Sequence, residues 1–98
     1  MQFIVIGRDG DDENAPSRRM AVRSQHIDYA RAAHEAGVLL YACGLKDGGV
    51  LVGSVMIFEF PDKPALEAHL AKEPYITGDV WLDIEIKEAG VPDFLLAV

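Results

Sequence analysis

Residues 50–60 (VLVGSVMIFEF) are hydrophobic at both sets of alternating positions, and this pattern restricts the fold more than any other feature. Successive side chains of a β-strand point to opposite faces of a sheet, so a strand of this kind needs an apolar cover on each face. One set is Val52, Met56, Phe58 and Phe60, and the other is Leu51, Val55 and Ile57. The sequence therefore predicts a sheet that is covered on both sides.

Three further segments have strand patterns. Residues 2–7 (QFIVIG) and 38–45 (VLLYACGL) are short apolar runs, as in strands at the centre of a sheet. Residues 80–87 alternate, with Leu82, Ile84 and Ile86 on one face and Trp81, Asp83, Glu85 and Lys87 on the other. The motif KDGG at residues 46–49 is typical of a β-hairpin. The strands on either side of it are predicted to pair antiparallel.

Two helical segments separate these strands. The first is marked by positions at near-helical spacing, which are Met20, Ile27, Ala30 and His34. An acidic loop at residues 8–14 precedes this helix, and Gly37 is expected to end it, since helix C-termini often need a left-handed residue. The second helix is predicted at residues 64–72 (PALEAHLAK), and Pro74 is expected to stop or kink it.

The resulting element order is β-α-β-β-α-β, which is the ferredoxin-like arrangement of the α+β class. In this fold an antiparallel four-stranded sheet carries both helices on one face. The other face then needs the second cover that the strand pattern demands, and the same face of another copy of the chain would supply it. We therefore expect a homodimer formed through the sheet face, to which the apolar tail at residues 94–98 would contribute.

Length and charge narrow the function classes. Ninety-eight residues suffice for one domain, predicted to span residues 1–98. A formal net charge of −7 argues against nucleic acid and anionic membranes as partners, because both attract basic surfaces. No membrane-spanning or signal segment is evident, and the single Cys43 is expected to be buried on its strand rather than reactive. These features predict a cytoplasmic protein whose partners are small molecules and other proteins.

Four segments in the expected order resemble the YciI-like family. They are AVRSQHIDYARAAHEAG (21–37), VLLYACG (38–44), GSVMIFEF (53–60) and AHLAKEPYITGDV (68–80). The resemblance implies a dimeric α+β barrel and an active-site pair of a histidine and an acidic residue, which here correspond to His26 and Glu73. The family commonly has Asp-Pro-Tyr where this chain has Glu73-Pro74-Tyr75, so the carboxylate stands on a stem one methylene longer.

The chemistry of His26 and Glu73 suits proton transfer. A histidine can accept or donate a proton near neutral pH, and a carboxylate on its other ring nitrogen would orient it. The alternative is that His26 is a capping or surface group of the first helix and that Glu73 only terminates the second helix.

Three further residues are candidates for binding a substrate. Arg23 lies one turn before His26 and would bind an anionic group, unless it pairs with a surface acid. Tyr75 would stack on a ligand or hydrogen-bond to it, unless it is only a packing anchor. Asp9 would line the mouth of the pocket, unless it is a turn residue.

No metal or cofactor is expected. His34 lies more than two helical turns from His26, and His69 with Glu73 lacks a third ligand at a recognisable spacing, so His69 is predicted to form a hydrogen bond on a helix surface. Phosphate-binding, dinucleotide-binding and nucleophile-elbow motifs are absent from the sequence.

Two functions remain. The first is a cofactor-independent isomerase, lyase or hydrolase acting on a small anionic or aromatic-derived substrate in a cleft between the first helix and the sheet. The second is a non-catalytic dimeric module for small-molecule binding or interaction.

Overall fold

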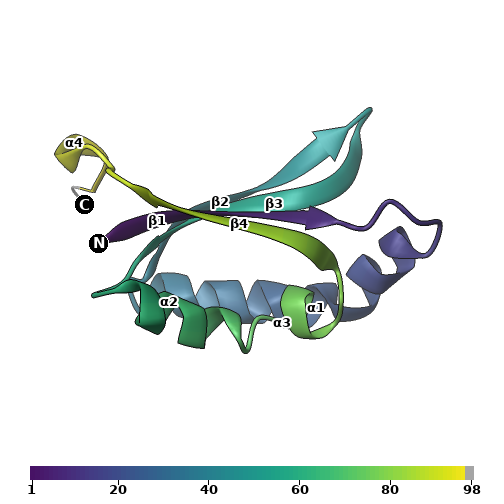
Figure 1. The fold of residues 1–98 in the computed structure, drawn as a ribbon, viewed down its shortest axis with the longest axis horizontal. Coiled ribbons are helices and arrows are strands. Elements are labelled where there is room, and N and C mark those ends of the chain that lie inside the picture. The colour runs from purple at the N-terminus through teal and green to yellow at the C-terminus, as the bar shows by residue number, and fades with distance from the viewer. Residues whose placement is uncertain (97–98) are drawn as a thin grey trace.

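The computed structural model describes residues 1–96, which form a four-stranded antiparallel sheet with the two main helices on one face (Figure 1). The elements are β1 (Gln2–Asp9), α1 (Ala15–Glu35), β2 (Leu39–Asp47), β3 (Val50–Glu59), α2 (Lys63–Leu70), α3 (Pro74–Thr77), β4 (Trp81–Ala89) and α4 (Asp93–Leu96). The strand order in the sheet is β2-β3-β1-β4. The predicted ferredoxin-like α+β fold with βαββαβ order is therefore confirmed.

Glycines at two chain reversals have the backbone angles that the sequence suggested. Gly48 and Gly49 have φ angles of 57° and 84°, and they connect the paired residues Asp47 and Val50. Two successive residues with positive φ form the tight hairpin turn whose twist matches the twist of the strands. Gly37 has a φ angle of 80° directly after α1, as expected for a helix end.

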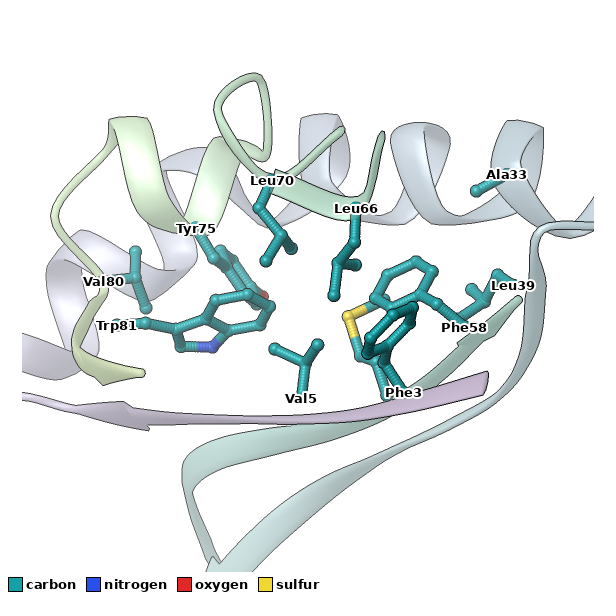
Figure 2. Packing of buried hydrophobic residues seen from close by; sticks show 11 residues of the cluster. Phe3, Val5, Ala33, Leu39, Phe58, Leu66, Leu70, Tyr75, Val80 and Trp81 are labelled. Atoms are coloured by element: carbon teal, nitrogen blue, oxygen red, sulfur yellow. The ribbon is translucent and has the colours of Figure 1, made fainter. Parts of the chain in front are cut away.

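The core lies between the sheet and the helices (Figure 2). Phe3 and Val5 of β1 and Phe58 of β3 point toward the helices, where they meet Leu66 of α2. A second group, formed by Tyr75, Val80 and Trp81, lies at the other end of the core. Burial of each large apolar side chain contributes about 1.5–3 kcal/mol to the stability of the fold. The packed side chains of this core therefore hold α1 and α3 on the sheet.

The predicted faces of β4 need a correction at Trp81. The side chain of Trp81 is only 3% exposed, and it lies on the helix side above Gly7, whereas Leu82 is exposed. The register between β1 and β4 shifts between Arg8 and Asp9, and this irregularity breaks the simple alternation of the strand. Gly7 has no Cβ, which leaves the space that the indole ring occupies.

The helix pattern was wrong at its first and last positions. Met20 is 67% exposed, His34 is also exposed, and the buried positions of α1 are Ala15, Arg19, His26 and Ala33. These four residues recur at intervals of four and seven, which places them on one side of a helix. The buried side therefore carries a charged residue that hydrophobic spacing does not reveal.

The segment around Pro74 also differs from the prediction. α2 ends at Leu70, and Pro74 begins α3 instead of only stopping a helix. Proline is tolerated in the first turn of a helix because its missing N–H would have no partner there. Glu73 is the N-cap of α3, and its side chain accepts a hydrogen bond from the backbone N–H of Tyr75 at 3.1 Å.

The face of the sheet opposite the helices is apolar over β1 and β3, as the patterns of these strands predicted, and charged over β4, where Lys87 pairs with Ile4 and Glu85 pairs with Ile6. Ile4 pairs with Ile57 and Ile6 pairs with Val55 in adjacent strands, and all four side chains are partly exposed. We call these four residues the open face. Cys43 pairs with Val55 and is exposed, so the expectation that it is buried was wrong.

The described part of the C-terminal tail, residues 94–96, is largely exposed. Phe94 and Leu95 of α4 are exposed, and α4 lies beyond the end of the sheet near the N-terminus (Figure 1). The tail was predicted to help cover the sheet, and its last part, residues 97–98, lies outside the described residues. No helix within residues 1–96 is long and apolar enough to cross a membrane.

Candidate active site

His26 and Glu73 lie in contact although 47 positions separate them in the sequence. Nδ1 of His26 is 2.5 Å from Oε1 of Glu73. The buried side of α1 carries His26, which is 8% exposed, and the start of α3 carries Glu73, which is 0% exposed. The structure thus brings together the two residues predicted as a catalytic pair, and their catalytic role remains a prediction.

A carboxylate accepts hydrogen bonds, so the Glu73 side chain is placed to accept one from Nδ1 of His26. His26 also lines a cavity. The other oxygen of Glu73, Oε2, is buried and has no hydrogen-bond partner within residues 1–96.

Two aromatic rings hold the His26 ring in place. The Tyr75 ring stacks on it with a centroid distance of 3.8 Å and an angle of 7° between the planes. Trp81 meets both rings edge-on, with its centroid 5.8 Å from that of His26 and 5.6 Å from that of Tyr75. Burial raises the pKa of the Tyr75 hydroxyl above its ordinary value, and the nearby Arg19 offsets part of this shift. Tyr75 therefore stays a neutral phenol at neutral pH.

Arg19 is the residue of the site that the sequence reasoning missed. Its side chain is almost fully buried, and its guanidinium donates to Asp9 at 2.7 Å and 3.3 Å and to the Tyr75 hydroxyl at 3.3 Å. Arg19 also donates to the backbone oxygen of Gly53 and to the hydroxyl of Ser54. Its spacing of seven residues before His26, two helical turns, was the available signal.

Asp9 is not among the residues that line the cavity beside His26. It lines a second cavity, and its carboxylate is the buried counter-ion of Arg19. A role for Asp9 in binding a substrate stays a prediction. A buried guanidinium requires a charged partner because its transfer from water is costly, and the end of β1 supplies that partner.

The cavity has a volume of about 300 Å³ and lies between α1 and the β2–β3 hairpin. Its polar lining consists of Arg19, Arg23, His26, Ser54 and Tyr75, and its apolar lining includes Ile27, Ala30, Ala42, Leu51 and Met56. The volume is at the lower end of ligand sites, which span about 300–1,000 Å³.

The two arginines of the cavity differ in their charge balance. Arg19 is paired with Asp9, whereas Arg23 forms no ion pair or hydrogen bond within residues 1–96 and is exposed. Arg23 is therefore the cation of this cavity that remains available to an anionic ligand.

The remaining histidines lie outside this site. Nδ1 of His34 lies 2.9 Å from the backbone oxygen of Leu39. His69 is half-buried instead of lying on a helix surface, and its ring stacks on Tyr29. No group of three or more potential metal-ligating side chains occurs in the described part of the chain.

The acidic loop is held by a surface ion pair. The two terminal nitrogens of the Arg18 guanidinium, Nη1 and Nη2, donate to the Asp12 carboxylate at 2.8 Å and 2.7 Å. This hydrogen bonding lowers the pKa of Asp12 to about 2. The loop is thus attached to the first turn of α1, away from His26.

The fold and the site define a small ferredoxin-like α+β protein with a buried histidine–carboxylate pair beside a cavity. Residues 1–89 match the model of the YCII-related domain, and the chain belongs to this family. The resemblance seen in the sequence is thereby confirmed. No curated protein matches the sequence.

Solved structures support the same fold. The chain is similar to 5-chloro-2-hydroxyhydroquinone dehydrochlorinase (TftG) from Burkholderia phenoliruptrix AC1100, solved with 2,5-dihydroxybenzoquinone, with a TM-score of 0.82 and 12% identity over 96% of this chain and 98% of that one. It is also similar to Rv0793 from Mycobacterium tuberculosis, with a TM-score of 0.51 and 11% identity over 93% and 95% of the two chains. At these identities the likeness shows the fold.

Proposed function

We propose that the chain is an enzyme that moves a proton on a small anionic or aromatic-derived substrate without a cofactor. The contact between His26 and Glu73 at the wall of a cavity carries this proposal. Nε2 of His26 would accept a proton from the substrate, and the Glu73 carboxylate would stabilise the imidazolium that forms. Return of the proton to another substrate atom gives an isomerase, and departure of a leaving group gives a lyase.

The lining of the cavity supports the substrate class. Arg23 supplies a cation without an internal partner, so it would bind a carboxylate or phenolate of the substrate. Leu51 and Met56 offer an apolar surface to a ring. TftG, the structural neighbour named above, is a dehydrochlorinase found with a hydroxylated quinone. An elimination of that kind also needs a group that accepts a proton, so a hydroxylated ring is the first substrate class to test.

Ligand binding tests the proposal. The probes are 2,5-dihydroxybenzoquinone and 4-hydroxybenzoate, and the measurement is the melting temperature with and without each probe. A ligand that binds only the folded state at about 100 times its Kd adds about 2.7 kcal/mol of stability, which a thermal shift detects. We expect Arg23→Gln to lose the shift and Arg31→Gln, an exposed change on the same helix, to keep it. If the ligand raised the melting temperature of both variants equally, Arg23 would have no role in binding it.

A second function is favoured by the hydrogen bond from the Tyr75 N–H to Glu73. Because Oε1 of Glu73 also caps α3, the residue has a structural role that a non-catalytic binding module would need as well. The enzyme is expected to convert a bound probe, and the binding module is not. A probe that binds the parent protein but is never converted, at any pH between 5 and 9, favours the binding module.

We also propose that two copies associate through the open face. Ile4, Ile6, Val55 and Ile57 form an apolar surface that one chain leaves partly exposed, and burial against an identical surface would remove it from water. Light scattering should give a dimer for the parent and a monomer for Ile57→Glu. Met20→Glu, an equivalent change at an exposed position of α1, should remain a dimer. A monomeric parent would overturn this proposal.

A further inference from the structure

Arg19 connects three parts of the chain around the candidate site. Its guanidinium binds Asp9 at the end of β1, Gly53 and Ser54 in β3, and the hydroxyl of Tyr75 in α3. The carbon of the guanidinium also lies 4.7 Å from the centre of the Tyr75 ring. A lysine ammonium cannot reproduce this planar set of donors, so the contacts are specific to arginine.

We propose that Arg19 is a positioning residue that fixes the ring of His26 by holding Tyr75. The inference rests on the proposed function only where it gives His26 a catalytic role. The positioning itself is a property of the free protein.

The contacts around His26 show why its position depends on Tyr75. Glu73 holds the Nδ1 edge, Trp81 lies edge-on to the ring, and Tyr75 covers one face of the ring. Tyr75 is in turn held at both ends, because its N–H binds Glu73 and its hydroxyl accepts from Arg19. Without Arg19 the phenol end of Tyr75 loses the only hydrogen bond that residues 1–96 give it, and the stacked pair can tilt.

Charge balance explains why Arg19 serves this role and not substrate binding. Its charge is compensated by the buried carboxylate of Asp9, which contacts two guanidinium nitrogens. An anionic ligand gains more from Arg23, whose charge is not compensated in this way. The two arginines of the cavity thus divide between positioning His26 and binding the ligand.

NMR of the ligand-free protein tests the proposal with Arg19→Lys and a matched control, Arg31→Lys. Arg31 lies on the same helix, and its one ion-pair partner among residues 1–96 is the exposed Asp28. Two signals of His26 are measured: the ring-current shift of its carbon-bound protons, caused by the Tyr75 ring, and the solvent exchange rate of its Nδ1 proton. In Arg19→Lys we expect a smaller ring-current shift and about tenfold faster exchange, the change that corresponds to one lost hydrogen bond between a charged and a neutral group. Arg31→Lys should match the parent.

A purely structural Arg19 would give a different result. The melting temperature of Arg19→Lys would fall, while both His26 signals would stay at their parent values below the transition, and that result overturns the proposal. If Arg19→Lys does not fold, Tyr75→Phe takes its place, because it removes only the hydroxyl that Arg19 binds and keeps the ring. Faster exchange at His26 in Tyr75→Phe supports the proposal, and parent values contradict it. Since no ligand is present, a failed search for substrates leaves these outcomes unaffected.

Discussion

Two histidines of this chain stack on tyrosines, and only one of them lies beside a buried carboxylate and a cavity. His26 lies on Tyr75 with ring centroids 3.8 Å apart, and His69 lies on Tyr29 with centroids 4.6 Å apart. Both pairs join α1 to the segment at residues 63–77. We call them the first and the second stacked pair.

The surroundings of the two pairs differ. In the first pair the imidazole contacts the Glu73 carboxylate and lines the cavity. In the second pair His69 contacts the rings of Phe58 and Phe60, and the Tyr29 hydroxyl donates to the backbone oxygen of His69 at 2.7 Å. Burial lowers the pKa of His69, which favours its neutral form. A carboxylate and a cavity, and not the stacking itself, therefore distinguish the candidate site.

The largest expected effect is a difference in turnover between variants in which His26 and His69 are replaced separately. If the chain is an enzyme, His26→Gln should reduce the turnover of an identified substrate by about 10²–10⁴-fold, the usual contribution of a general acid or base. His69→Gln should leave turnover within about twofold, since His69 does not line the cavity. Steady-state rates at saturating substrate measure both. Equal losses in the two variants would contradict the distinction between the pairs.

A smaller effect, on the free energy of unfolding, should follow from adding a methyl group next to the first stacked pair. A Cβ on Gly7 would lie 2.2 Å from Cδ2 of Trp81, the ring that meets His26 and Tyr75 edge-on. Overpacking of this kind costs about 1–3 kcal/mol, so Gly7→Ala should lower the free energy of unfolding by that amount in urea titrations.

The control for this change is Gly90→Ala. A Cβ on Gly90 would meet nothing within 4 Å, and its effect should stay within about 0.5 kcal/mol. The NMR signals of Tyr75 should move in Gly7→Ala, while those of Tyr29 stay in place. If the NMR signals of Tyr75 and Tyr29 shifted to the same extent, the two stacked pairs would not be independent.

The fold could be predicted from the sequence, whereas the stacking of His26 on Tyr75 was not predicted. Alternation in residues 50–60, the Gly48–Gly49 turn and Gly37 are local signals, and local signals are enough to order strands and helices. His26 and Glu73 were selected because a family resemblance placed them together, and no local pattern indicates a contact between residues 47 positions apart.

The parts that could not be predicted depend on tertiary contacts. Arg19 is buried because Asp9 compensates its charge, and hydrophobic spacing alone selected its neighbour Met20 for the buried side of α1. Trp81 is buried because the register shifts between Arg8 and Asp9 and because Gly7 leaves space for the indole ring, and strict alternation in β4 does not include such a shift. Both errors arose where a charge or a shape on another element decides which side chain is buried.

The second pair can be weakened without affecting the first. Tyr29→Phe removes the hydroxyl that donates to His69, and loss of one such hydrogen bond costs about 0.5–1.5 kcal/mol. Urea titration should show this loss, while Tyr41→Phe, a change at an exposed tyrosine whose hydroxyl has no hydrogen bond within residues 1–96, should stay within about 0.5 kcal/mol. If the urea unfolding curves of Tyr29→Phe and the parent were identical, the hydrogen bond from the Tyr29 hydroxyl to His69 would add no stability over hydrogen bonds to water.

The smallest expected effect is a pH dependence that arises from the second pair. Burial lowers the pKa of His69 below its ordinary value of 6.5, and the charge of Glu73 offsets part of this shift. The unfolded chain then binds a proton at this residue more readily than the folded one, so the contribution of His69 to stability is complete above pH 6.5 and is lost as the pH falls through the folded pKa. The urea midpoint of the parent should fall between pH 7.5 and pH 5.5, and that of His69→Gln should fall less. NMR titration of the His69 ring protons measures the same shift directly, and a midpoint for His69→Gln that falls as far as that of the parent would assign the pH dependence to other groups.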